Sequence, residues 1–230
     1  MNVERTQTGI PKLDDLLHGG IPKGGITLIA GGPGTGKTVF AAQFLYHGAA
    51  QLDEKGIYVC FGESAETLKQ YLWTLGWDFD ELERQGKMRI LDLFATAKEN
   101  LETVLNIILD ETRVFEARRL VIDSVTALAL TYEKKIEVRI LVSLLQKFLR
   151  KMGCTTLLVT ETAWGSTGIG AGVEEFIADG IILLETAFDG VEFKRRLAVI
   201  KMRATEHDIR YYRFVISPKT GISIIPYPEA

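Results

Sequence analysis

The sequence predicts an α/β protein with a mostly parallel central sheet, helices on both faces and a C-terminal antiparallel extension. Short apolar runs alternate with segments of helical periodicity from about residue 25 to residue 160. Such alternation is typical of a parallel sheet covered on both faces. After Gly172 the apolar runs are joined by short links without helical patterns between them, which indicates antiparallel strands.

Each element follows from a local pattern. The parallel strands are expected at apolar runs in 25–30, 56–61, 88–93, 118–124 and 155–160. Apolar residues at helical spacing predict helices over 37–51, 65–75, 101–117 and 136–152. The extension is expected at 180–185, 194–202, 211–217 and 221–227, with turns at 188–190 and 217–221. No repeat, linker or low-complexity tract interrupts the chain, so we expect one domain over residues 1–230.

Composition limits the classes of function. The 230 residues are 47% hydrophobic and 25% charged with a net charge of −3, which argues against a protein built mainly to coat nucleic acid but leaves room for a local basic patch. Cys60 and Cys154 lie in apolar runs and are expected to be buried, reduced thiols. No apolar run approaches the ~20 residues of a membrane span, and the N-terminus lacks the apolar core of a signal peptide. We therefore expect a cytoplasmic protein.

Residues 31–38 read GGPGTGKT and fit the pattern G-x-x-x-x-G-K-[ST] between a predicted strand and a predicted helix. Glycines let the backbone curl so that several N–H groups point at a phosphate chain, and the following helix presents its positive end. Lys37 is placed to reach the β- and γ-phosphates, and Thr38 offers a hydroxyl to Mg²⁺. The alternative is a glycine-rich turn between a strand and a helix. The residues expected to bind nucleotide are Gly32, Pro33, Gly34, Thr35, Gly36, Lys37, Thr38 and Val39.

A carboxylate for the metal is expected at Asp123, which ends the apolar run LVIDS. Ligands of α/β proteins bind at the carboxyl ends of the strands. The alternative is an Asp that only caps a helix. Together Thr38 and Asp123 predict a site for a nucleoside triphosphate with Mg²⁺.

Four segments together resemble the KaiC family of RecA-like ATPases: TGIPKLDDLLHGGIPKGGITLIAGGPGTGKT, VIDSVTAL, GVEEFIADGIILL and KMRATEHD. The resemblance covers nearly the whole chain. The chain is similar to a single-domain relative rather than to the two-domain clock protein. It implies a RecA-like P-loop NTPase fold and a ring, usually a hexamer, with ATP held between subunits. The choice of ATP over GTP rests on this resemblance.

Residues 201–207, called the cation segment, contain Lys201, Arg203 and His207. If the preceding strand continues, Lys201 and Arg203 share a face, because side chains two apart on a strand point the same way. The resemblance implies that this segment reaches the nucleotide of the neighbouring subunit. The alternative is a solvated, ion-paired strand end.

The chain departs from the family pattern after its second strand. Family members usually carry two adjacent glutamates there, one of which helps to activate the attacking water. This chain reads CFGES, so the first position is Gly62 and only Glu63 remains. Glu63 is the candidate base; the alternative is a charge at the start of the next helix. Glu175 and Phe176 stand where the clock protein carries its self-phosphorylated Ser-Thr pair, so autokinase activity is not expected.

Two further features are left open. Thr160 and Glu161 end the fifth strand, where they either sense the γ-phosphate or simply finish the strand. The following glycine-rich loop TAWGSTGIGAGVEE has no Lys or Arg and is flanked by acids, so we expect weak or no DNA binding, since phosphate contacts dominate such affinity. Trp164 within it either stacks on a base or packs in a core or interface.

The sequence therefore favours a slow, Mg²⁺-dependent, ring-forming ATPase. The alternative is an ATP-responsive switch or scaffold that recruits a signalling protein with negligible hydrolysis. A DNA motor is disfavoured by the charge of the chain and by the missing basic loop.

Overall fold

The computed structural model describes residues 3–96, 100–131, 135–162 and 177–225. Within these ranges the main feature is a nine-stranded sheet of order β11-β10-β9-β8-β3-β7-β6-β4-β5. Its strands are β3 Ile26–Gly31, β4 Gly56–Cys60, β5 Met88–Asp92, β6 Arg119–Asp123, β7 Thr155–Glu161, β8 Gly180–Phe188, β9 Phe193–Met202, β10 Tyr212–Ser217 and β11 Gly221–Ile224. A separate antiparallel ribbon pairs β1 (Arg5–Thr6) with β2 (Ile21–Pro22).

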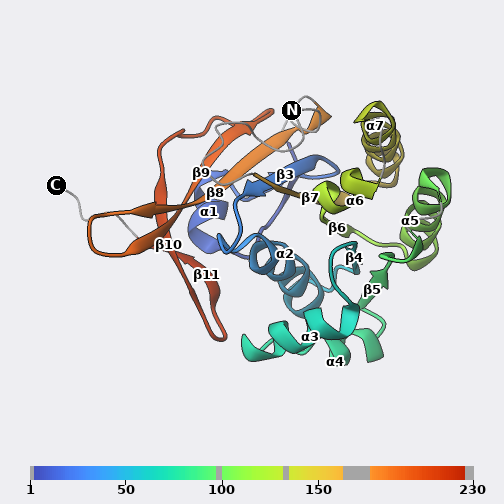
Figure 1. Ribbon diagram of the computed structural model, residues 1–230, viewed down its shortest axis with the longest axis horizontal. Coiled ribbons are helices and arrows are strands. Elements are labelled where there is room, and N and C mark those ends of the chain that lie inside the picture. The colour runs from blue at the N-terminus through green and yellow to red at the C-terminus, as the bar shows by residue number, and fades with distance from the viewer. Residues whose placement is uncertain (1–2, 97–99, 132–134, 163–176, 226–230) are drawn as a thin grey trace.

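Helices cover both faces of the sheet (Figure 1). One core joins the sheet to α1 Pro11–Leu16, α2 Lys37–Gln51, α3 Ala65–Thr74 and α4 Phe79–Arg84. The second core joins it to α5 Leu101–Phe115, α6 Val125–Thr131 and α7 Lys135–Met152. Neighbouring strand residues alternate between the two, so Ile29 and Tyr58 belong to the first core and Leu28 and Ile57 to the second. The predicted α/β class, with helices on both faces, is confirmed.

The sheet is parallel from β8 to β5 and antiparallel from β8 to β11. The predicted antiparallel extension is therefore present (Figure 1). Because β3, β4, β6 and β7 run in the same direction, their carboxyl ends meet at one edge of the sheet. The loops that follow these four strands are therefore brought together.

The short elements α1, α4, α6 and the β1–β2 ribbon were not predicted. Two of these helices have six residues and the third has seven, which is too short for an apolar pattern to repeat clearly. In α4 the beginning is set by Asp78, whose side chain accepts a hydrogen bond from the N–H of Glu81 over 2.8 Å.

The strand predicted over 194–202 is observed with the same end, so the condition for Lys201 and Arg203 to share a face, a strand that continues to Arg203, is not met. The strand does not continue to Arg203: β9 ends at Met202, and Arg203 lies in the turn that follows. Ala204 adopts a φ of 54°, a left-handed conformation outside the β region. The alternation that would place Lys201 and Arg203 on one face is therefore interrupted.

The two cysteines, Cys60 and Cys154, are free and buried, as predicted. Across the described part of the chain, no helix combines the length and the apolar character needed to cross a bilayer.

Candidate functional site

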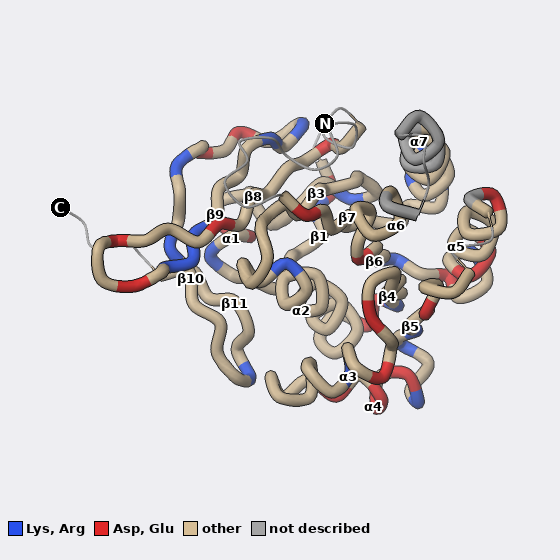
Figure 2. The backbone as a smooth tube through the Cα atoms, in the orientation of Figure 1, with Lys and Arg blue, Asp and Glu red and all other residues tan. Residues whose placement is uncertain are grey.

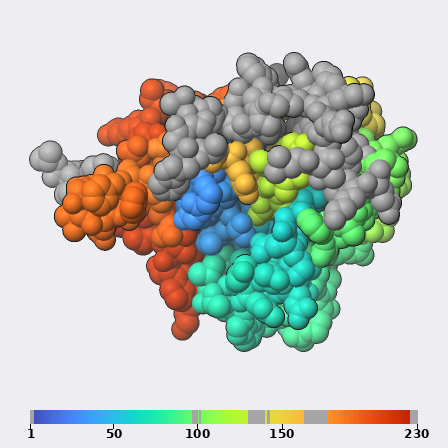
Figure 3. Space-filling model, viewed as in Figure 1, coloured from blue at the N-terminus to red at the C-terminus, as the bar shows by residue number. Residues whose placement is uncertain are grey.

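The phosphate loop connects β3 to α2 and depends on glycine at defined places. Gly34 and Gly36 have φ values of 72° and 102°, which L-residues with side chains rarely adopt. At Gly31 an added Cβ would lie 2.4 Å from the carbonyl oxygen of Leu184 on the neighbouring strand. The loop reaches the surface between the β8–β9 region and the α3–α4 region (Figure 3). Its backbone is therefore shaped and exposed as a phosphate cradle requires.

Lys37 begins α2 and folds back over the loop. Its Nζ donates to the carbonyl oxygen of Gly32 over 2.8 Å. Burial lowers the pKa of Lys37, while the charges of Glu161 and Asp123 work to raise it. Among the other expected loop residues, Pro33 and Gly34 are exposed, Thr35 is buried, and Val39 is half-buried in the first turn of α2. A half-buried ammonium group beside the loop is available to a phosphate chain.

Thr38 and Asp123, from different elements, are in direct contact. The Oγ1 of Thr38 donates to Oδ2 of Asp123 over 3.0 Å. Tyr58, from β4, donates to the same oxygen over 2.6 Å. Burial raises the pKa of Asp123, and the hydrogen bonds from Tyr58 and Thr38 work to lower it.

This donor set fits Mg²⁺, which prefers hard oxygen ligands and usually takes only one or two from the protein, the rest being water and phosphate. No group of three or more His, Cys, Asp or Glu residues in the described ranges is arranged for a metal. A hydroxyl and one carboxylate are therefore suited to a cation shared with a nucleotide.

A cavity of about 260 Å³ opens beside this pair. Its lining includes Gly62, Glu63 and Glu161 together with Thr38, Tyr58, Cys60, Asp123, Ser124 and Ala127. Burial and then the charge of Asp123 raise the pKa of Glu63. The start of α3 is capped by a different residue. That capping role belongs to Ser64, whose Oγ accepts from the N–H of Thr67 over 3.2 Å.

Thr160 and Glu161 have different surroundings at the end of β7. The Oγ1 of Thr160 lies 3.0 Å from that of Thr126 on α6, and Thr160 is fully buried. Glu161 lines the cavity. Of this pair, Glu161 therefore faces the space beside the phosphate loop.

Tyr58 and Arg195 are site residues that the sequence did not indicate. Tyr58 stands in an apolar run like those of any buried strand. Arg195, on β9, donates from Nε to the carbonyl oxygen of Gly34 over 3.2 Å, across 161 positions of sequence. Its neighbours Lys194 and Arg196 are paired with carboxylates instead. Basic residues gather on the β9–β10 side of α2 (Figure 2), and Arg195 is the member that meets the phosphate loop.

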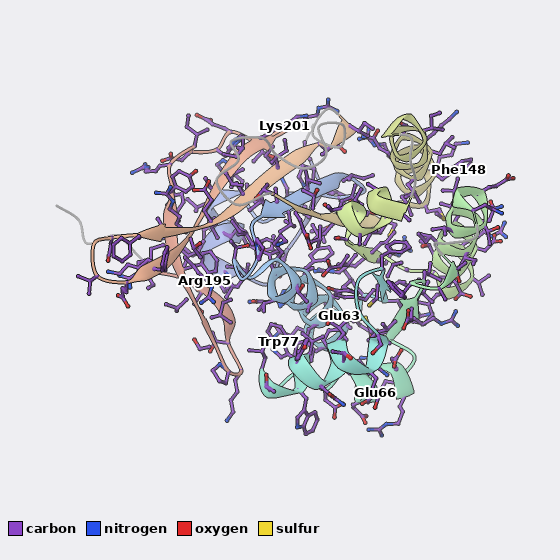
Figure 4. All side chains as sticks on the ribbon, in the orientation of Figure 1. Glu63, Glu66, Trp77, Phe148, Arg195 and Lys201 are labelled. Atoms are coloured by element: carbon purple, nitrogen blue, oxygen red, sulfur yellow. The ribbon has the colours of Figure 1, made fainter. Side chains whose placement is uncertain are left out.

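The cation segment and the phosphate loop lie at opposite ends of the strands. The N–H of Arg203 donates to the carbonyl oxygen of Asp179. The N–H of Asp179 donates in turn to the carbonyl oxygen of Ile26. Arg203 is therefore level with the first residue of β3, whereas the phosphate loop follows its last residue, Gly31. Five residue steps of about 3.3 Å place them roughly 17 Å apart along the strand. Figure 4 likewise shows Lys201 well apart from Glu63 and Arg195.

Two side chains of the cation segment, those of Arg203 and His207, have partners in their own chain. Arg203 pairs with Asp179 over 3.1 Å, and its side chain is 54% exposed. Nδ1 of His207 lies 3.1 Å from the carbonyl oxygen of Thr205, and its Nε2 is buried without a partner in the described ranges. Burial and then the nearby charge of Arg203 lower the pKa of Lys201. None of the three approaches the phosphate loop of the same chain.

Several sequence-based expectations fall outside the described residues. These are the glycine-rich loop with Trp164, and the positions Glu175 and Phe176.

Comparison with known proteins gives consistent matches. A family model described as the KaiC ATPase matches residues 6–229. A UPF0273 protein of Thermotoga maritima is 39% identical over 97% of each chain, and one of Methanocaldococcus jannaschii is 36% identical over 99% of this chain and 98% of its own. The circadian clock oscillator protein KaiC of Thermosynechococcus vestitus is 35% identical over 97% of this chain but only 44% of its own length.

Among solved structures, a KaiC-like protein of Pyrococcus horikoshii has a TM-score of 0.89 at 40% identity, covering 98% of this chain and 100% of that one. With this coverage the match spans the sheet, the phosphate loop and the C-terminal extension.

Proposed function

This chain belongs to the KaiC ATPase family, and from this premise we propose that it hydrolyses ATP slowly, with Mg²⁺, in a ring of identical subunits. Each nucleotide lies between two subunits. One subunit supplies the phosphate loop with Thr38, Asp123 and Glu63. Its neighbour supplies the cation segment with Lys201, Arg203 and His207.

The separation of these two half-sites carries the proposal. Arg203 lies roughly 17 Å along the sheet from the end of β3 and is paired with Asp179, so it is remote from the nucleotide of its own chain. If two different surfaces on neighbouring subunits complete one site, the subunits are in head-to-tail contact. Repeating this contact from subunit to subunit generates a closed ring when the rotations between neighbours add up to a full turn. The expected number of six subunits comes from the family resemblance.

Within one subunit, the loop amides and Lys37 bind the phosphates, and Thr38 and Asp123 hold the metal. When bound, Mg²⁺ would supply positive charge that neutralises the charge developing on the phosphates. Glu63 lines the cavity beside Asp123 and acts as the base that orients the attacking water. Its raised pKa suits a carboxylate that must accept a proton.

From the neighbouring subunit, Arg203 and Lys201 place positive charge at the γ-phosphate, and His207 completes the segment. Cations supplied in this way contribute about 10³–10⁵ to the rate of phosphoryl transfer. Binding of ATP depends mainly on the phosphate loop. Loss of Arg203 is therefore expected to affect turnover far more than affinity.

The test measures ATP turnover and particle mass together for the wild type and for Arg203→Ala. We expect both proteins to form rings and to bind nucleotide, with turnover strongly reduced in the variant. Arg210→Ala is the matched control, because Arg210 pairs with Asp208 shortly after the same segment. A wild-type protein that stays monomeric at saturating Mg²⁺ and ATP, or equal turnover in both variants, would refute the shared site.

The second candidate is an ATP-responsive switch or scaffold that recruits a signalling protein with negligible turnover. Gly62 favours it, because only Glu63 remains of the two expected carboxylates. A single-turnover hydrolysis assay separates the candidates. An enzyme loses its activity in Glu63→Gln, whereas a switch shows negligible conversion before and after the change.

A further inference from the structure

The backbone of the cation segment is fixed by the N-terminal part of the chain. Arg5, on β1, donates from Nη2 to the carbonyl oxygen of Ala204 over 2.9 Å and from Nη1 to Oγ1 of Thr205. These contacts join residues separated by 199 and 200 positions of sequence. One guanidinium therefore binds the two residues that directly follow Arg203.

A second N-terminal residue binds the same segment further along. Nε2 of His18 lies 3.0 Å from the carbonyl oxygen of Glu206, and a carbonyl can only accept, so the ring nitrogen is the donor. His18 follows α1 and has a φ of 55°. Arg5 and His18 thus contact three consecutive residues, 204–206, between Arg203 and His207.

The residue before these three, Arg203, is held by Asp179. Its carboxylate accepts from Arg203 over 3.1 Å, from Arg150 over 2.7 Å and from the N–H of Ile26 over 3.0 Å. The turn between these two sets of contacts contains Ala204 with its positive φ of 54°. Such a conformation is unfavourable for a residue with a side chain. It persists only where surrounding contacts impose it.

We propose that Arg5 is a positioning residue for the cation segment and that His18 assists it. Both shape the turn that aims Arg203 and His207 at the nucleotide of the adjoining subunit. This inference rests on the proposed shared site. Catalytic groups must be held close to their productive geometry, and a displacement of about 1 Å can cost 10²-fold in rate. Arg5 is remote from its own phosphate loop, since it contacts the turn that lies at the far end of the sheet.

The test compares Arg5→Ala with Lys23→Ala. Lys23 forms an ion pair with Glu4 beside the same β1–β2 ribbon, so its removal perturbs the ribbon and leaves residues 204–206 alone. We expect Arg5→Ala to bind fluorescent ATP and form rings like the wild type, with turnover reduced about 10- to 100-fold. Lys23→Ala should match the wild type in all three. His18→Ala should show a smaller loss of turnover. Because His18 lies outside the β1–β2 ribbon, this variant tests the turn without altering a ribbon residue.

Mixed rings give a readout that a merely structural role would not produce. Lys37→Ala removes the nucleotide half-site and keeps the cation segment, whereas Arg5→Ala does the reverse. After the two proteins are mixed in equal amounts and allowed to exchange subunits, about a quarter of the sites combine an intact loop with an intact segment. Turnover should then rise well above that of either parent.

The outcomes separate this inference from the proposed function. If Arg203→Ala is impaired but Arg5→Ala and His18→Ala are not, positioning by the N-terminal residues is wrong and the shared site stands. If Arg5→Ala loses activity without recovery in mixed rings, its role is only structural. If Arg203→Ala itself keeps full turnover, the proposed shared site is wrong, and the positioning role that rests on it is wrong as well.

Discussion

Tyr58 donates a hydrogen bond to the carboxylate of Asp123 over 2.6 Å, on the oxygen that also accepts from Thr38. Cys60 pairs with Asp123 across β4 and β6, and Tyr58 lies two residues earlier on the same face of the sheet. The tyrosine ring is only 1% exposed, and its pKa is raised well above the ordinary value, mainly by burial. It therefore stays protonated and acts as a constant donor to the carboxylate that we assign to Mg²⁺.

Tyr58→Phe removes only this donor. We expect the Mg²⁺ concentration that gives half-maximal nucleotide binding to rise about tenfold, because partners that orient a ligating carboxylate typically change metal affinity by 10- to 100-fold. This Mg²⁺ concentration is measured by following the binding of fluorescent ATP as Mg²⁺ is added. Tyr46→Phe, the same substitution on α2 away from Asp123, is the control. Equal half-saturation in both variants would show that the hydrogen bond does not orient Asp123 for the metal.

Gly62→Glu tests whether the missing carboxylate limits turnover. Within the described residues, an added Cβ at Gly62 would meet no atom within 4 Å, and Gly62 does not have a positive φ, so this part of the chain can accept the side chain without strain. A second carboxylate beside Glu63 is expected to increase ATP turnover by about tenfold or more if water activation is limiting. Gly62→Gln adds a similar volume without charge and should not reproduce the gain. Equal turnover in the two variants would place the limitation elsewhere.

Arg195→Ala is expected to weaken nucleotide binding directly. The guanidinium contacts the phosphate loop at Gly34 and places positive charge beside the loop that we propose binds the phosphates. We expect the dissociation constant for ATP to rise about tenfold at low salt, with a smaller difference at high salt, where exposed charges are screened. Lys194→Ala is the control, since Lys194 pairs with Asp189. Similar losses in both variants would indicate a general charge effect rather than a contact with the loop.

Asp179→Asn should destabilise the fold in a pH-dependent way. Burial works to raise the pKa of Asp179, but hydrogen bonds from Arg150, Ile26 and Arg203 outweigh it, so the pKa is lowered. A lowered pKa in the folded state contributes stability above the unfolded-state pKa of 3.8, and this stability is lost as the pH falls through the lower folded value.

Denaturant unfolding measures this effect. We expect the variant to lose about 1–3 kcal/mol at pH 7, and we expect the difference to shrink as the pH falls below about 4. Asp110→Asn, in an exposed ion pair with Arg113, should lose less than about 1 kcal/mol. A difference for Asp179→Asn that stayed constant with pH would contradict a charged, hydrogen-bonded carboxylate.

The family resemblance and the fold class were both available from the sequence and are confirmed. Their evidence is local: the GGPGTGKT loop has its own requirement for glycine, and each strand and long helix has its own apolar period. The predicted helix over 37–51 matches α2 in both bounds. The short helices escaped prediction because six or seven residues do not establish a period.

The candidate site was predictable only in part. Thr38 and Asp123 could be paired in advance, because one follows a glycine-rich loop and the other ends a parallel strand, and such ends meet at one edge. Arg119 shows the limit of this reasoning. It begins an apolar strand like an ordinary surface cation, yet it is fully buried and donates to Glu54, Gln7 and Phe44.

The sequence by itself determined where the phosphate loop lies, which strand supplies Asp123 and that the core sheet is parallel. Only the tertiary structure decided that Tyr58 meets Asp123, that Arg195 meets Gly34, and that Arg5 binds the turn after Arg203 at the far end of the sheet. The physical reason is that glycine conformation and apolar periodicity are properties of neighbouring residues. Contacts between side chains far apart in sequence depend instead on strand order, register and side-chain reach, which are settled only when the whole sheet has assembled.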